Sequence, residues 1–167
     1  SFQKAHDRAL HFLSYRPRSE AEIQRYLRDK GVPKPIEEEI IQRLKAVGLL
    51  DDLAFARYWV EDRERFKPRS ARMLRYELRR KGVSDEIIAK ALEDLDEEES
   101  AYRAAGHRAH RLLNLDYKSF RRRLGAYLRR RGFSYEVARN ASERLWRELG
   151  TADDADTTDY TDTANPR

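Results

Sequence analysis

Apolar residues recur four positions apart just ahead of three glycines in this chain. The three apolar pairs and their glycines are Ile23, Leu27 and Gly31; Leu74, Leu78 and Gly82; and Leu124, Leu128 and Gly132. A spacing of four places two side chains on the same face of a helix. Glycine is the residue favoured just after a helix end. The pattern therefore predicts three helices, each with one buried stripe and each ended by its glycine.

The segments around these glycines resemble one another. They read YLRDKGV (26–32), ELRRKGV (77–83) and YLRRRGF (127–133), so the glycines lie 51 and then 50 residues apart. A fixed period of this size is typical of tandem repeats. Serines precede the three helices at positions suited to N-caps, namely Ser19, Ser70 and Ser119. Ser19 and Glu22 have the spacing of a capping box.

Two more helices are expected in each repeat. One follows the glycine, beginning at Pro33–Pro35, Ser84 or Ser134. Another precedes the capping serine, over about 5–15, 52–66 and 97–113. No segment alternates with the period of two expected of a strand. The fold class predicted is all-α, with three tandem three-helix repeats similar to helix-turn-helix units.

The repeats are assigned to residues 1–50, 51–99 and 100–150. Because 39% of the residues are charged, an elongated and curved molecule is expected rather than one compact core. Residues 151–167 are acidic, rich in threonine and without periodicity, which predicts a disordered tail.

Charge is distributed unevenly over these segments. The net charge is +3 in the first repeat, −3 in the second, +9 in the third and −4 in the tail, for +5 overall. The third repeat holds 13 basic and 4 acidic residues. A surplus of this kind favours an anionic partner.

The third repeat concentrates arginine on one helix, expected over 119–131. Arg122 and Arg129 lie seven positions apart and nearly superimpose along the axis, as do Arg123 and Arg130 beside them. Small residues, Gly125 and Ala126, lie among the four. A cationic face with a low centre can approach a phosphate backbone or an acidic protein groove closely, and a merely solvated face is the alternative.

Other basic residues extend this candidate interface. They are Lys118 and Arg121 beside the four arginines, and Arg16, Arg18, Arg25 and Arg28 in the first repeat. A different role is expected for Lys30, Lys81 and Arg131, which directly precede the three glycines. Cations in the last turn of a helix interact favourably with its free carbonyl groups.

Catalysis, metal binding and membrane insertion lack sequence support. The chain has no cysteine and no glycine-rich phosphate loop. His107 and His110 could share a helix face, but no third ligand lies in their segment. No apolar run approaches the ~20 residues of a membrane span. The aromatic group of Phe55, Tyr58 and Trp59 suits either a stacking platform for bases or, as favoured here, core packing. An enzyme, a cofactor and a membrane partner are therefore not expected.

Several motifs in order resemble the RecX family of recombination regulators. They are LHFLSYRPRSEAEIQRYLRDKGV (10–32), VGLLDD (47–52), FARYWVEDR (55–63), RYELRRKGVSDEII (75–88) and YLRRRGFSYEVA (127–138). The resemblance covers about residues 5–149. It implies a bacterial, cytoplasmic, monomeric protein that uses no cofactor. It also implies binding in the groove of the RecA filament on single-stranded DNA, with double-stranded DNA as a second candidate. Such binding would restrain the ATPase, strand-exchange and coprotease activities of RecA.

Two other interpretations remain open at the level of sequence. Three-helix units with an arginine-rich helix also suit a helix-turn-helix regulator that reads a duplex site. A helical repeat scaffold that binds only proteins is the other.

Overall fold

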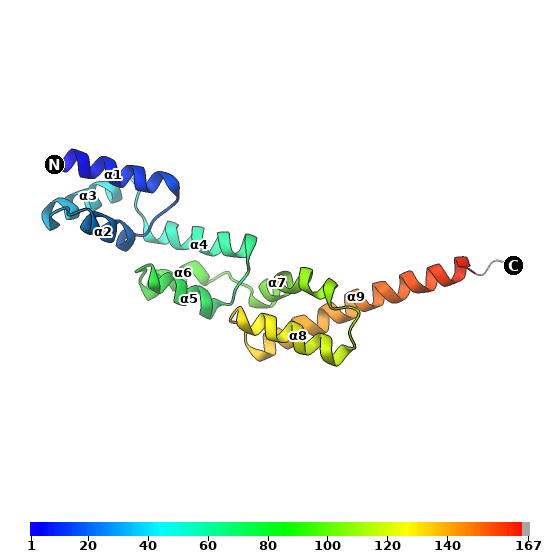
Figure 1. Cartoon of the computed structure of the whole chain (residues 1–167). Helices are drawn as coiled ribbons and strands as arrows, with labels where there is room; N and C mark the ends of the chain where they lie inside the picture. The colour runs from blue at the N-terminus through cyan, green and yellow to red at the C-terminus, as the bar shows by residue number, and fades with distance from the viewer. Residues whose placement is uncertain (165–167) are drawn as a thin grey trace. The chain divides into compact units, whose positions relative to one another are not determined.

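The structure is a computed structural model that describes the backbone of residues 1–164 and the side chains of residues 1–150. Over this range the regular structure consists of nine α-helices and no strand, which confirms the all-α prediction (Figure 1). The helices are α1 (Phe2–Tyr15), α2 (Glu20–Asp29), α3 (Lys34–Ala46), α4 (Asp52–Phe66), α5 (Ala71–Arg80), α6 (Asp85–Leu92), α7 (Glu97–Arg111), α8 (Tyr117–Arg130) and α9 (Tyr135–Ala164).

The chain divides into two compact units. The first consists of Ser1–Arg65 and Leu74–Asp94, and the second begins with Phe66–Met73 and continues from Leu95. Each unit is described by itself, and the elongated, curved shape and the repeat boundaries at 50, 99 and 150 stay predictions. None of the helices in the described range is both long enough and apolar enough to cross a membrane.

The predicted apolar stripes form the core of each unit. In the first unit, Ile23 and Leu27 of α2 are fully buried against α1 and α3. In the second unit, α8 buries its stripe against α7 and α9, and Phe120 joins Leu124 and Leu128 there. The ring of Trp146 on α9 lies 5.0 Å from that of Phe120, so this tryptophan packs onto the third bundle as expected.

The three glycines end their helices in the left-handed conformation that the sequence predicts. Their φ angles are 77° at Gly31, 81° at Gly82 and 94° at Gly132. At Gly82 the backbone N–H donates to the carbonyl of Arg79 at 2.9 Å, and the next N–H, of Val83, donates to the carbonyl of Leu78 at 3.1 Å. The same pair of bonds closes the other two helices.

Four of the five predicted serine caps are confirmed, and one is wrong. Ser19 forms the full capping box with Glu22, and the hydroxyls of Ser70, Ser84 and Ser134 each accept the N–H three residues on. Ser119 instead lies inside α8, whose N-cap is Asp116. The Asp116 carboxylate accepts the Ser119 N–H at 2.7 Å. Aspartate is at least as good an N-cap as serine, and starting at Asp116 adds helix.

In both units, successive repeats meet where the start of one middle helix faces the glycine turn of the next. In the first unit, the Ser19 hydroxyl donates to the carbonyl of Lys81 at 2.6 Å, and a Cβ added to Gly82 would overlap Ala21. In the second unit, a Cβ added to Gly132 would overlap the hydroxyl of Ser70. The start of a middle helix therefore packs against the glycine turn of the following repeat.

The structure differs from the sequence prediction at the C-terminal end. Residues 151–164, expected to be irregular, continue α9 as helix. A helix nucleated in the third repeat can propagate through this segment because the first proline after Gly150 is Pro166. The remainder of the predicted tail, 165–167, lies outside the described residues.

Candidate nucleic-acid interface

Helix α8 has one buried face and one cationic face. Its apolar stripe fixes its rotation against α7 and α9, so the residues between stripe positions point outward. The four arginines predicted to form the contact face are all exposed: Arg122, Arg123, Arg129 and Arg130. Local sequence alone therefore determines which side of α8 is charged.

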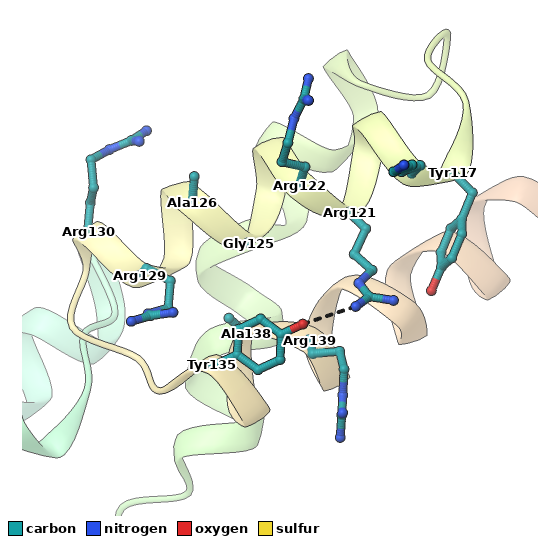
Figure 2. A pocket seen from close by; sticks show the side chains of 11 residues that line it. Tyr117, Arg121, Arg122, Gly125, Ala126, Arg129, Arg130, Tyr135, Ala138 and Arg139 are labelled. Carbon is teal, nitrogen blue, oxygen red and sulfur yellow. Dashed lines mark hydrogen bonds between the residues drawn. The ribbon is translucent and has the colours of Figure 1, made fainter.

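A groove of about 770 Å³ runs between α8 and the start of α9. Its lining includes five predicted interface residues, namely Lys118, Arg121, Arg122, Arg129 and Arg130. Tyr117, Tyr135 and Arg139 also line it and were missed by the sequence analysis. Figure 2 shows Gly125 and Ala126 on the part of α8 between these arginines. Tyr135 and Arg139 share a helix face four residues apart, but only the pairing of α8 with α9 brings them to the groove.

The predicted interface residues of α8 line two different grooves, one on each side of the helix. Arg123 lines a second groove of about 380 Å³, with Arg108, Arg111 and Leu112 from the end of α7. Ala126 and Arg130 line both grooves. Arg108 and Arg111 were also missed, although their spacing of three on one helix was a visible signal.

The four arginines of the contact face differ from Arg144 of the same repeat in their ion pairing. In the part of the chain with described side chains, none of them forms an ion pair. By contrast, Arg144 on α9 pairs with Glu99 at 3.3 Å and with Glu148 at 3.1 Å. The third repeat thus neutralises a cation elsewhere while the α8 face keeps its full charge.

Two titrating groups mark the edge of the face. The pKa of Asp116 is lowered mainly by the backbone and side-chain hydrogen bonds of Ser119, with smaller contributions from the charges of Arg122 and Lys118. The Arg121 guanidinium donates to the hydroxyl of Tyr135 at 3.1 Å. This bond, followed by one with Tyr117, raises the pKa of Arg121 above its already high value. Arg121 therefore links α8 to α9 as a fixed cation.

The basic residues proposed in the first repeat are engaged differently. Arg16 pairs with Glu22 at 2.5 Å, and Arg28 pairs with Glu37 at 3.1 Å. Arg18 lies 3.7 Å from the centre of the Phe12 ring, and burial, then the charge of Arg16, lowers its pKa. Arg16 and Arg18 line one groove, of about 400 Å³, while Arg25 is exposed on α2.

The other candidate groups are dispersed or structural. Phe55 is only 2% exposed and belongs to the buried core, as favoured from sequence. The indole N–H of Trp59 donates to Glu77 at 2.8 Å, and Tyr58 is exposed, so the three rings form no common platform. His107 and His110 belong to no group of three or more metal-ligating side chains among the described residues.

Comparison with known proteins identifies the family models and relatives that this chain matches. Family models for the first, second and third three-helix domains of RecX match residues 5–44, 51–92 and 96–141. The regulatory protein RecX of Prosthecochloris aestuarii is 36% identical over 143 residues, covering 86% of this chain and 94% of the relative. That of Mycobacterium sp. (strain KMS) is 38% identical over 144 residues, covering 81% and 78%.

Solved structures agree with the fold. The crystal structure of RecX from Lactobacillus salivarius superimposes with a TM-score of 0.74 at 24% identity, over 86% of this chain and 96% of that one. A second crystal structure, of regulatory protein RecX, gives a TM-score of 0.67 at 28% identity, over 81% and 68%. With three domain models matched in order and relatives more than one-third identical over most of their length, the chain belongs to the RecX family of regulatory proteins.

Proposed function

We propose that this protein regulates RecA by binding in the groove of the RecA filament on single-stranded DNA. Binding there restrains the ATPase, strand-exchange and coprotease activities of RecA. The protein acts as a monomer in the bacterial cytoplasm. The observation that carries the proposal is the exposed α8 face, where four arginines lie beside two grooves. Among residues 1–150, whose side chains are described, none of the four forms an ion pair. Membership in a family of regulatory proteins supports a regulatory role.

The chemistry of this face suits a phosphate backbone. Guanidinium groups bind phosphate oxygens in a bidentate manner and stay charged at every physiological pH. Gly125 and Ala126 leave the centre of the face low, so a strand can lie close to α8 with arginines on either side. An acidic groove on RecA itself could meet the same cations, and the experiment below separates these cases.

The test is co-sedimentation with RecA filaments on single-stranded DNA, together with the RecA ATPase rate. The matched variant replaces Arg122, Arg123, Arg129 and Arg130 with glutamine, a good helix former that preserves α8. Each phosphate neutralised on single-stranded DNA contributes roughly −0.7 to the slope of log affinity against log salt. Contact by three or four arginines therefore predicts a slope that is flatter by about 2–3.

Four outcomes decide between the functions. Weaker co-sedimentation and weaker ATPase inhibition by the glutamine variant support the proposal. Wild-type affinity and salt dependence in that variant would show that α8 is a solvated surface. A preference for one duplex sequence would indicate a helix-turn-helix regulator, and equal RecA binding with and without DNA would indicate a protein-interaction scaffold.

A further inference from the structure

The groove between α8 and α9 combines cations with an apolar floor. Five basic side chains of α8 and Arg139 of α9 surround it. The floor includes Gly125, Ala126 and the buried Ala138, and Tyr135, a residue that is 58% exposed, contributes an aromatic side chain. In Figure 2, Arg121 and Arg129 extend toward the side of Tyr135, whereas Arg122 and Arg130 point away from it. A ligand of this groove needs a flat apolar part as well as negative charge.

Neither backbone conformation nor packing within the protein requires a glycine at position 125 on the groove floor. Its φ angle is not in the left-handed region, and a Cβ added there would meet no atom within 4 Å. Glycine inside a helix costs about 1 kcal/mol relative to alanine. The glycines of the turns differ, because positive φ and, at Gly82 and Gly132, close packing require them. Free space at Gly125 instead benefits a molecule that approaches α8 from outside.

We infer that this groove is a base-stacking subsite for single-stranded nucleic acid. One base stacks on the ring of Tyr135, and the adjoining backbone passes over Gly125 and Ala126 with its phosphates on Arg122, Arg129 and Arg130. Arg121 holds the tyrosine hydroxyl at 3.1 Å and so fixes the ring. Because Ala126 and Arg130 also line the second groove, the strand continues across α8 toward Arg123. The inference rests on the proposed function and specifies its contact with DNA.

Nucleic acid fits this groove better than an acidic peptide does. Carboxylates would satisfy the cations but would leave the aromatic ring and the apolar floor without a partner. A nucleotide supplies a planar base and a phosphate within one unit, and aromatic side chains bind bases of any sequence by stacking. The groove volume, about 770 Å³, is also within the range of about 300–1,000 Å³ typical of small-ligand sites.

The first test separates stacking from charge. Binding of the full chain to oligothymidylate of about 12 nucleotides, a length within the usual range of single-stranded sites, is compared with binding to an abasic strand of equal phosphate number. Tyr135→Ala is expected to weaken oligothymidylate binding at least about fivefold, the equivalent of about 1 kcal/mol. It should leave abasic binding within about twofold, and Tyr135→Phe should keep most of the affinity because the ring remains.

Tyr76 of α5 provides a matched control. It is 56% exposed, and its hydroxyl accepts a hydrogen bond from Arg80 at 3.2 Å, much as Tyr135 accepts one from Arg121. It lines none of the grooves described above. Tyr76→Ala should leave both affinities unchanged. Equal losses in the two alanine variants, or a loss at Tyr135 that is the same on abasic DNA, would overturn the stacking assignment.

The second test fills the groove without removing a contact. Gly125→Leu is expected to reduce oligothymidylate binding about tenfold without lowering the melting temperature, because leucine favours helix and the site is open. The control is Gly106→Leu in α7. A Cβ added to Gly106 also meets nothing within 4 Å, and Gly106 lines neither of the two α8 grooves. Unchanged binding by Gly125→Leu would show that no strand passes over α8.

Failure of the subsite and failure of the proposed function give different results. If Tyr135→Ala and Gly125→Leu bind oligothymidylate as the wild type does, the subsite is wrong even when RecA co-sedimentation persists. If the wild type shows base-dependent binding that both variants lose, while RecA filaments are not bound, the subsite stands and the proposed target is wrong. Stronger binding of a polyglutamate peptide than of oligothymidylate would assign the groove to an acidic protein segment and overturn the inference.

Discussion

Gly31 and Gly82 show that one turn conformation serves two purposes. Both residues have positive φ after a middle helix, at 77° and 81°. A Cβ added to Gly31 would meet nothing within 4 Å, whereas one added to Gly82 would overlap Ala21 of the preceding repeat. Gly31 is thus needed for its backbone alone, and Gly82 is needed for its backbone and for the contact between repeats.

This difference predicts unequal effects of the same substitution. Gly31→Ala should cost about 1–2 kcal/mol of unfolding free energy, the penalty for a left-handed L-residue. Gly82→Ala should cost about 1–3 kcal/mol more, because the added methyl also overpacks against α2. Urea denaturation of both variants measures the difference. Equal losses would show that the contact between Gly82 and Ala21 adds nothing to stability.

Arg131 illustrates a basic residue whose main role is structural. Its N–H is bonded in the last turn of α8, and its guanidinium donates to the Tyr127 hydroxyl at 2.8 Å. Lys30 takes a similar position in the first repeat, 5.6 Å from the centre of the Tyr26 ring. The residue before the glycine therefore covers a tyrosine four positions earlier in both helices.

We expect Arg131→Gln to lower stability by about 0.3–1 kcal/mol, the usual value of a cation at a helix C-terminus. The slope of log DNA affinity against log salt should remain close to that of the wild type. Thermal melting and a salt titration check the two parts. A slope as flat as that of the quadruple glutamine variant would move Arg131 into the contact face.

At the scale of elements, helix ends were predictable and helix pairing was not. The glycine turns and the capping box at Ser19 depend on a few adjacent residues, so local sequence is sufficient for them. The prediction of Ser119 as an N-cap was wrong because Asp116, three residues earlier, caps α8 instead. The grooves needed tertiary structure: Tyr135 and Arg139 reach α8 only through the packing of α9, which no local pattern specifies.

Glu22 connects α2 to two other elements and should make their stability depend on pH. It is half-buried, accepts bonds from Arg16 and the Ser19 N–H, and pairs with Lys81 at 3.5 Å. Burial alone would raise the pKa of Glu22, but these bonds and charges lower it below 4.5. A carboxyl whose pKa is lowered by folding stabilises the fold above its unfolded pKa and loses this contribution as pH falls through its folded pKa.

Glu22→Gln should therefore reduce stability near neutral pH, and the difference from the wild type should shrink as the pH is lowered below the ordinary pKa of 4.5. Urea unfolding at a series of pH values from neutral to about 3 measures the effect. A difference independent of pH would mean that packing of the side chain, and not its charge, stabilises this junction.

Over the whole molecule, a strongly basic repeat is followed by an acidic segment. Residues 100–150 carry a net charge of +9, and 151–167 carry −4. The backbone of 151–164 continues α9, whose first turn lines the groove, so the aspartates of this segment lie farther along the same helix than the groove residues. Their influence on the α8 face should then be a screened, long-range repulsion of DNA.

Truncation after Gly150 should raise DNA affinity at about 0.01 M salt, where the Debye length is about 30 Å, and have little effect at about 0.15 M, where it is about 8 Å. Fluorescence anisotropy with a labelled single strand measures both affinities. A gain that persists at the higher salt would indicate direct competition by the aspartates for the arginines. No gain at either salt would leave the segment electrostatically passive.

The hydroxyl of Ser19 has a consequence for the timing of motion. It accepts the N–H of Glu22 at 3.1 Å and donates to the carbonyl of Lys81 at 2.6 Å, so one atom joins the first turn of α2 to the end of α5. If either the start of α2 or the end of α5 frays, the Ser19 hydroxyl loses one of its two hydrogen bonds, and the other helix end is less well held. In deuterium exchange, the amides of these two turns should therefore open as one event, at one rate. The boundary between these two repeats is therefore expected to open cooperatively, with both helix ends exchanging together.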